Sequence, residues 1–163
     1  MSPTILCFII STAATNGQAP LYKQNIQTAC ANAEHLINVA NKYSIDPTVV
    51  AALIWVESRW VKKAVSHAGA CGLTQVIPKY SKYNCKQLFN TKRSIAEGVH
   101  FLNAWMKSRK KKMPEALACY NAGWKCLKSK YGKNYSRLVL KIANIYRIIL
   151  KNNKKLIFSN QIR

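Results

Sequence analysis

Apolar residues recur at helical spacing along most of this 163-residue sequence, and this periodicity limits the fold more than any other feature. It predicts five helices, at residues 25–43, 46–62, 94–109, 114–123 and 136–150. Residues 66–90 are instead rich in proline, glycine and polar side chains, which predicts irregular structure with a short β-hairpin. The length suits one domain with its own hydrophobic core. We therefore expect a single, mainly α domain with a small β contribution.

The charge balance is strongly basic. Lys and Arg number 26 against five acidic residues, which gives a formal net charge of +21. Such a surface attracts polyanions, and nucleic acid, anionic lipid and bacterial cell wall all qualify. The sequence has no zinc-finger spacing, RNP-type aromatic motif or heptad-flanked basic region, so we expect no nucleic acid partner. The apolar content of 49% argues against a disordered chain.

Residues 1–19 carry no charged side chain, and the apolar run Ile5–Ala14 has the length of a signal-peptide core. This run is too short to span a membrane. We expect a signal peptide that is removed near Ala14 or Ala19, which leaves a secreted or periplasmic domain at residues 20–163. The alternative is an N-terminal core helix, which the turn-forming residues after the run make less attractive.

Removal of residues 1–19 would leave five of the six cysteines, namely Cys30, Cys71, Cys85, Cys119 and Cys126. They are consistent with an oxidising compartment, as two disulfides and one free thiol, although the sequence does not fix the pairing. Five reduced, buried cysteines are the alternative. No CxxC motif occurs and the three histidines lack a second ligand at metal-site spacing, so we expect no metal and no cofactor.

Glu57 does not fit its surroundings. In the expected 46–62 helix it shares a face with apolar residues, namely Val50, Leu53, Ile54 and Trp60. A buried carboxylate has either a raised pKa or a specific partner. A carboxylic acid that stays protonated near neutral pH can protonate the leaving oxygen of a glycosidic bond. The alternative is an ion pair with Arg59 or a lysine at the helix edge.

The other four acidic residues have structural explanations. Asp46 is a helix N-cap. Glu97 follows Ser94 by three residues, which is the spacing of a capping box. Glu115 lies in the first turn of a helix, where the helix dipole favours a negative charge, and Glu34 faces the polar side of the 25–43 helix. No second carboxylate stands out as a nucleophile, so a glycosidase of this kind would use one acid twice.

Three ordered motifs carry a resemblance to a known family. They are Glu57-Ser58-Arg59-Trp60, the segment Gly69–Gln75 followed by Pro78, and Ala116–Gly123. Together they resemble the soluble lytic transglycosylases, relatives of goose-type lysozyme, and the likeness extends over about residues 45–146. It implies an α+β lysozyme-like fold, with the irregular segment beside the active-site cleft, that acts on the glycan strands of peptidoglycan. We expect a monomer.

The resemblance also implies a mechanism. The acid of the family's ES motif, here Glu57, would protonate the oxygen between N-acetylmuramic acid and N-acetylglucosamine. The substrate's N-acetyl group would assist, and the same carboxylate would then act as a base on the C6 hydroxyl, leaving a 1,6-anhydromuramic product.

Five substrate-binding positions carry over from the family, namely Ser66, Gln75, Tyr120, Asn121 and Tyr135. Ser66 would orient the N-acetyl group and Gln75 would bind the glycan. Tyr120 and Asn121 would line the cleft, and the Tyr135 hydroxyl would approach the acid. The alternatives are purely structural roles: a turn hydroxyl for Ser66, a solvated side chain for Gln75 and buried aromatic rings for the tyrosines.

Some positions depart from the family pattern without removing a reacting group. Thr74 stands where methionine is usual, and Trp124 where proline is common, so either residue could alter the sugar-binding surface. Two other functions stay open: a hydrolytic muramidase on the same fold, and a non-catalytic module that binds cell wall or another polyanion. The sequence does not choose among secretion, conjugation and phage machinery as partners.

Overall fold

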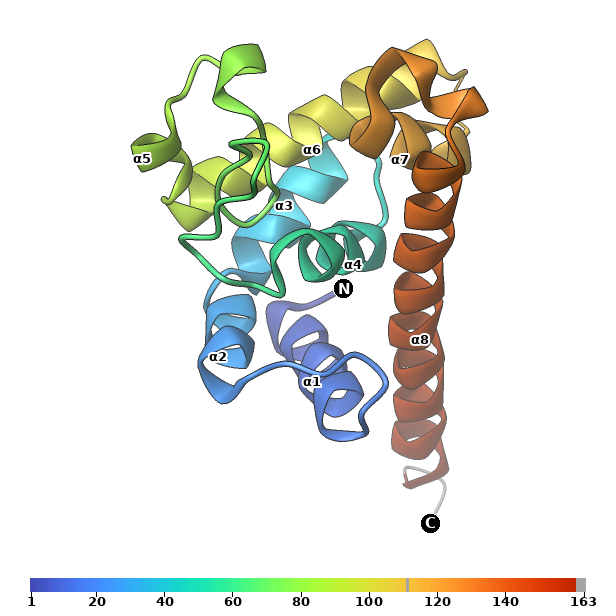
Figure 1. Ribbon diagram of the computed structural model, residues 1–163. Coiled ribbons are helices and arrows are strands. Elements are labelled where there is room, and N and C mark those ends of the chain that lie inside the picture. The colour runs from blue at the N-terminus through green and yellow to red at the C-terminus, as the bar shows by residue number, and fades with distance from the viewer. Residues whose placement is uncertain (111, 161–163) are drawn as a thin grey trace.

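The computed structural model describes residues 1–110 and 112–160, and within them the chain is mostly helical (Figure 1). In chain order the elements are α1 Pro3–Thr15, α2 Lys23–Ala31, α3 Ala33–Lys42, α4 Pro47–Ser58, η1 Pro78–Tyr80, α5 Cys85–Leu88, α6 Thr91–Ser108, α7 Met113–Ala122, η2 Gly123–Lys128 and α8 Lys130–Asn160. The expected single, mainly α domain is confirmed. In place of the expected hairpin, Cys71 forms isolated antiparallel bridges with Val65 and Val76.

Helix α4 is the central element of the core. Nine of its 12 residues are buried, and it packs against α3 and α8. The predicted N-cap is confirmed, because Asp46 accepts the amide of Thr48 at 2.8 Å. The helix ends at Ser58, four residues earlier than predicted, since Arg59 and Trp60 have φ values of 50° and 62°. This turn carries the Trp60 ring into the interior, where it is fully buried, and leaves Glu57 in the last helical turn.

The helix predicted at residues 25–43 is two helices, α2 and α3, which meet at Asn32. The Asn32 side chain donates to the Thr28 carbonyl at 2.8 Å and is buried there. Asparagine competes for backbone hydrogen bonds in this way, so it interrupts a helix that apolar spacing alone would continue.

Two boundaries later in the chain also differ from the prediction. Helix α6 begins at Thr91, with Asn90 as its N-cap, so Ser94 lies inside the helix and the predicted capping box of Ser94 and Glu97 is wrong. Helix α8 begins at Lys130 and continues to Asn160, so it is longer at both ends than the helix predicted at residues 136–150. Glu115 lies in the first turn of α7 as predicted.

Residues 3–15 form α1, which buries Leu6, Ile9, Ile10 and Ala13 against α2, α3 and α8. While this segment is present it is therefore a core helix, the alternative that the sequence made less attractive. The fold does not test whether residues 1–19 are cleaved off, so the signal peptide stays a prediction. Across the described residues, none of the helices combines the length and the apolar character needed to cross a membrane.

All six cysteines are paired, which differs from the alternative of reduced cysteines. The free thiol was expected only after removal of residues 1–19, and that removal would take away Cys7, the partner of Cys30. Cys7 in α1 bonds to Cys30 in α2. Cys71 in the irregular segment bonds to Cys85 in α5, and Cys119 in α7 bonds to Cys126 in η2. The last two disulfides lie within or next to the motifs and fix the segments on either side of α6.

Candidate active site

Glu57 is partly buried in the last turn of α4, and its only hydrogen-bond partner among the described residues is the Tyr135 hydroxyl, which donates to Oε1 at 2.6 Å. The alternative of an ion pair with Arg59 is wrong, because the Arg59 guanidinium lies 3.2 Å from the centre of the Trp55 ring. Burial raises the pKa of Glu57 to about 7, and the Tyr135 hydrogen bond only partly offsets this. The group can therefore exchange a proton near neutral pH.

Two tyrosine hydroxyls from different helices accompany this acid. Tyr120 of α7 donates to the Thr74 carbonyl at 2.8 Å. Burial, together with the charge of Glu57, raises the pKa of both Tyr120 and Tyr135 well above the usual tyrosine value. Both hydroxyls thus remain protonated and serve as hydrogen-bond donors beside Glu57.

The segment before α5 is tied to the end of α4 by a serine. The buried Ser58 hydroxyl donates to the Leu73 carbonyl at 2.8 Å. Gly72, next to Leu73, lets the same loop pack against the end of α5, since it has a φ of +76° and a Cβ there would lie 2.3 Å from the Leu88 carbonyl oxygen. The serine of the ES motif therefore positions the loop that carries Thr74 and Gln75.

Thr74 faces the interior of the protein and not a sugar-binding surface. Its side chain is fully buried, and Oγ1 donates to the Ser94 carbonyl of α6 at 2.7 Å. Gly98 makes room for it, because a Cβ at Gly98 would lie 2.4 Å from Thr74 Cβ. Sequence spacing alone did not reveal this contact. The feature of the sequence that could have indicated it is a serine and a glycine, Ser94 and Gly98, one helical turn apart on the buried face of α6.

The structure brings Glu57, Tyr120 and Tyr135 together, and it places the other predicted site residues nearby in the motifs. The Gln75 amide donates to the carbonyls of Ala64 and Gly72 at 3.1 and 2.9 Å, so its nitrogen is occupied within the loop. Ser66 accepts the Ala70 amide at 3.1 Å, which is the role of a turn hydroxyl. Asn121 is exposed in the last turn of α7. Substrate contacts by these three residues stay predictions.

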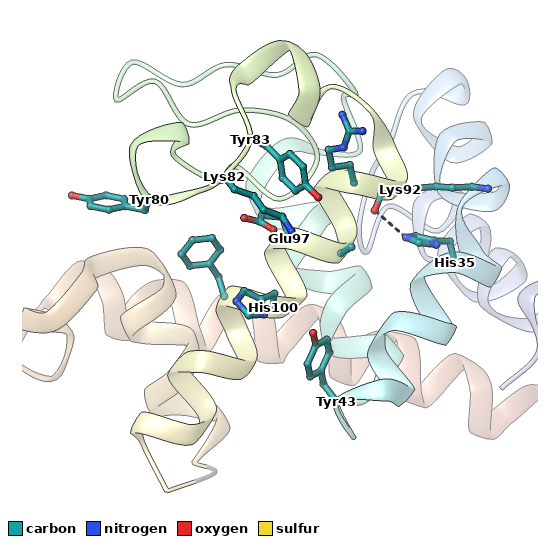
Figure 2. A pocket seen from close by; sticks show the side chains of 11 residues that line it. His35, Tyr43, Tyr80, Lys82, Tyr83, Lys92, Glu97 and His100 are labelled. Carbon is teal, nitrogen blue, oxygen red and sulfur yellow. Dashed lines mark hydrogen bonds between the residues drawn. The ribbon is translucent and has the colours of Figure 1, made fainter.

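A cavity of about 620 Å³ lies between α3, the loop after η1 and α6 (Figure 2). None of the predicted site residues lines it. Elsewhere in residues 1–110 and 112–160, no three His, Cys, Asp or Glu side chains gather at a spacing that would hold a metal ion.

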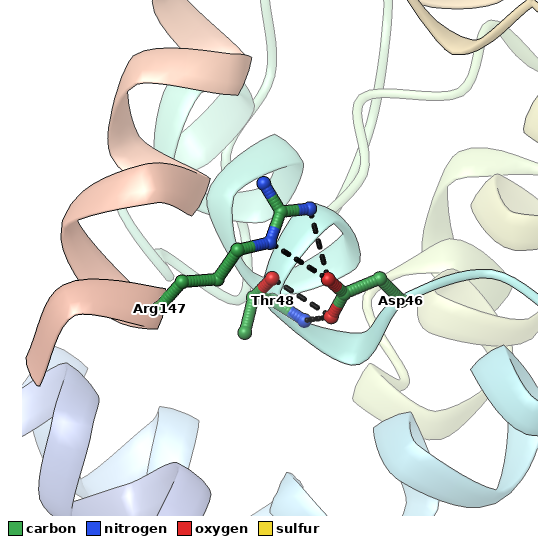
Figure 3. Close-up of polar contacts among 3 residues, drawn as sticks. All are labelled: Asp46, Thr48 and Arg147. Atoms are coloured by element: carbon green, nitrogen blue, oxygen red, sulfur yellow. Dashed lines mark hydrogen bonds and ion pairs between the residues drawn. The ribbon is translucent and has the colours of Figure 1, made fainter. Parts of the chain in front are cut away.

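The opposite end of α4 carries a second carboxylate, Asp46, in a contrasting environment (Figure 3). Its Oδ1 accepts both the amide and the hydroxyl of Thr48 at 2.8 Å, and Oδ2 lies 2.8 Å from an Arg147 nitrogen of α8. Burial alone would raise the pKa of Asp46. The hydrogen bonds from Thr48 and the charge of Arg147 outweigh it, so the pKa lies below the usual value.

Comparison with known proteins agrees with this geometry. The model of the family described as Transglycosylase SLT domain matches residues 34–142. An X-ray structure of an inactive mutant of the lytic transglycosylase Slt from Pseudomonas aeruginosa superposes with a TM-score of 0.66 at 20% sequence identity. That match covers 78% of this chain and 25% of the other, so the shared fold corresponds to about a quarter of the larger protein.

Proposed function

The protein belongs to the Transglycosylase SLT domain family, whose model covers more than half of the chain, and we propose that it cleaves bacterial peptidoglycan as a lytic transglycosylase. Its target is the β-1,4 bond between N-acetylmuramic acid and N-acetylglucosamine, and Glu57 is the catalytic acid and base. One observation carries the proposal: Glu57 is a partly buried carboxylic acid with a pKa of about 7, and among the described residues one hydroxyl is its hydrogen-bond partner.

The proposed reaction uses the two protonation states of Glu57 in turn. Protonated Glu57 gives its proton to the glycosidic oxygen as the bond from that oxygen to C1 of the muramic ring breaks, with assistance from the substrate's N-acetyl group. The Glu57 carboxylate then takes the proton of the C6 hydroxyl while O6 bonds to C1. The enzyme regains its proton, no water is consumed, and the product ends in a 1,6-anhydro ring.

Tyr135 supports the second half of this cycle. Its hydroxyl donates to Glu57 Oε1 at 2.6 Å, and such a bond to a charged acceptor is stronger than one to a neutral group. It therefore favours the carboxylate that must act as base, while burial favours the acid that acts first. In the proposal Tyr120 and Asn121 line the cleft, Ser66 orients the N-acetyl group and Gln75 contacts the glycan.

The proposed substrate lies outside the cytoplasm, and the disulfides Cys71–Cys85 and Cys119–Cys126, which removal of residues 1–19 would leave intact, fit such an oxidising location. We therefore also propose that the protein is exported and acts as a monomer. Export by an N-terminal signal peptide and association with secretion, conjugation or phage machinery belong to this proposal as well.

Mass spectrometry of digested peptidoglycan tests the function. We expect anhydro ends, each lighter than a reducing end by one water, from the wild-type protein. Glu57→Gln should yield no products, and the control Glu115→Gln should digest normally, because Glu115 pairs with Lys112 on the surface. Reducing ends alone would make the protein a muramidase. Cleavage by Glu57→Gln would refute the single-acid mechanism, and binding without any cleavage by the wild type would indicate a wall-binding module.

A further inference from the structure

Glu97, on the wall of the cavity between α3 and α6, has no capping role in the structure. Its side chain accepts the Ser81 hydroxyl at 2.6 Å, which is its only hydrogen bond within the described residues. No ion pair reaches it there, although the chain carries 26 Lys and Arg and three of them, Lys82, Lys92 and Arg93, line the same cavity. The carboxylate thus keeps hydrogen-bonding capacity for a ligand.

Two of these cations are held by an aromatic ring and do not pair with Glu97. The Arg93 guanidinium lies 4.9 Å and the Lys82 ammonium 5.2 Å from the centre of the Tyr83 ring. Cation–π contacts of this kind hold a charge in place without neutralising it. Figure 2 shows Tyr83 on one side of Glu97 and His100 on the other, with the Lys82 side chain overlapping Glu97 in this view. The cavity therefore has a negative pole at Glu97 and a positive pole at Lys82 and Arg93, with no ion pair between them.

The cavity is electrostatically connected to the Glu57 site. Besides burial, the charges of both Glu57 and Glu97 raise the pKa of Tyr120. Gly98, the residue after Glu97, packs directly on Thr74, whose carbonyl receives the Tyr120 hydroxyl. Thr74 therefore links the two places, because it receives the Tyr120 hydroxyl on the Glu57 side and contacts Gly98 on the cavity side.

We infer that this cavity binds the stem peptide of peptidoglycan through a zwitterionic group, with the ligand's ammonium on Glu97 and its carboxylate on Lys82 and Arg93. The inference rests on the proposed function. Stem peptides carry carboxylates and, where they are not cross-linked, the free amine of a diamino acid. The rings of Tyr43 and Phe101, which also line the cavity, offer apolar surface for the methylene groups between the charges.

The two poles together exclude simpler ligands. A polyanion such as a phosphate polymer would be attracted by the cations but repelled by Glu97, and a polyamine would meet the reverse arrangement. Only a ligand with both charges satisfies both ends of the cavity, because an unpaired charge that loses water on binding is penalised.

Kinetics on three substrates test the inference: glycan strands with stem peptides, the same strands stripped by an amidase, and peptide-bearing strands with acetylated stem amines. For the wild-type protein we expect a KM about tenfold lower on the first substrate, which is the effect of one charge-assisted hydrogen bond, with kcat unchanged. Glu97→Gln keeps an oxygen for Ser81 and should bring the three KM values together. The exposed Glu34→Gln is its charge-matched control.

The positive pole is tested in the same way. Lys82→Gln should raise KM on peptide-bearing strands, whereas Lys86→Gln, on exposed α5 outside the cavity, should not. Equal wild-type KM values on stripped and peptide-bearing strands would overturn the inference, as would identical behaviour of Glu97→Gln and Glu34→Gln.

A binding measurement separates this inference from the proposed function. If the wild-type protein cleaves no strand at all, the proposed function fails, and NMR titration with a free stem tripeptide still tests the cavity. Shifts at Tyr83 and His100 that disappear in Glu97→Gln would support zwitterion binding. Absence of binding, or tighter binding of polyphosphate than of tripeptide to the wild-type cavity, would refute it.

Discussion

The two ends of α4 place carboxylates in opposite situations. At the N-terminal end Asp46 is surrounded by donors, the Thr48 amide and hydroxyl and the Arg147 guanidinium, and these lower its pKa. At the C-terminal end Glu57 has one donor and no cationic partner among the described residues, and its pKa rises to about 7. Burial acts in the same direction on both groups. The number of donors decides which carboxylate remains ionised.

The helix itself contributes to this difference. The amides of a first helical turn point at an N-cap side chain, whereas the carbonyls of the last turn repel a negative charge. Asp46 is thus the ion that stabilises the start of α4, and Glu57 is the group that can hold or release a proton. A structural acid and a candidate catalytic acid differ here by their position on one helix.

Among substitutions at the two ends of α4, the largest expected effect is on cleavage. Glu57→Gln removes the proton donor and should lower the cleavage rate by at least about 1000-fold, while Asp46→Asn, an equal loss of charge on the same helix, should leave kcat unchanged. Product formation over time is the measurement. Comparable losses in both variants would show that the ends of α4 do not differ in function.

The second effect is on stability. The pKa of Glu57 is about 7 when folded and 4.5 otherwise, so the folded state binds the extra proton between these values and stability falls as pH rises through this window. The full loss is about 3 kcal/mol. Glu57→Gln should remove this pH-dependent loss. The variant should therefore be more stable than the wild type at about pH 8 and equally stable at about pH 4. Urea unfolding at both values measures this, and a pH-independent difference would contradict it.

The contribution of Asp46 to stability should depend on pH in the opposite direction and to a smaller extent. Its folded pKa is lowered, so its contribution is present above the unfolded value and disappears as pH falls. Asp46→Ala removes the cap and should cost about 1 kcal/mol near neutral pH. Asp46→Asn should cost less, because asparagine still caps and the half-exposed ion pair with Arg147 contributes little. Equal unfolding midpoints for wild type and Asp46→Ala would refute this role.

The smallest effect concerns Tyr135. Its hydrogen bond lowers the pKa of Glu57, so Tyr135→Phe should raise that pKa and move the alkaline limb of the kcat profile to higher pH, by less than about one pH unit. The profile of cleavage rate against pH is the measurement, with Tyr131→Phe as a control because Tyr131 is exposed on α8. A shift toward lower pH would show that Tyr135 acts on Glu57 in another way.

The sequence by itself determined the helical class, the Asp46 cap and the unusual position of Glu57, because each follows from neighbours within a few residues. Spacing along α4 places Glu57 among Leu53, Ile54 and Trp60 whatever the rest of the chain does. The ordered motifs likewise identified the segments that meet at the site. Local pattern could not determine where helices stop, since the Asn32 side chain bonds to preceding backbone and α4 ends in a left-handed turn that buries the Trp60 ring.

The family resemblance had indicated Tyr135 near Glu57, and the tertiary structure decided the other partners. Tyr135 lies 78 residues from Glu57 and Arg147 lies 101 residues from Asp46, and no spacing rule connects such pairs. The same holds for Glu97, which sequence spacing assigned to Ser94 and which the fold instead turns toward Ser81. A carboxylate's pKa depends on the donors and solvent around it, and in this protein helices far apart in sequence supply both.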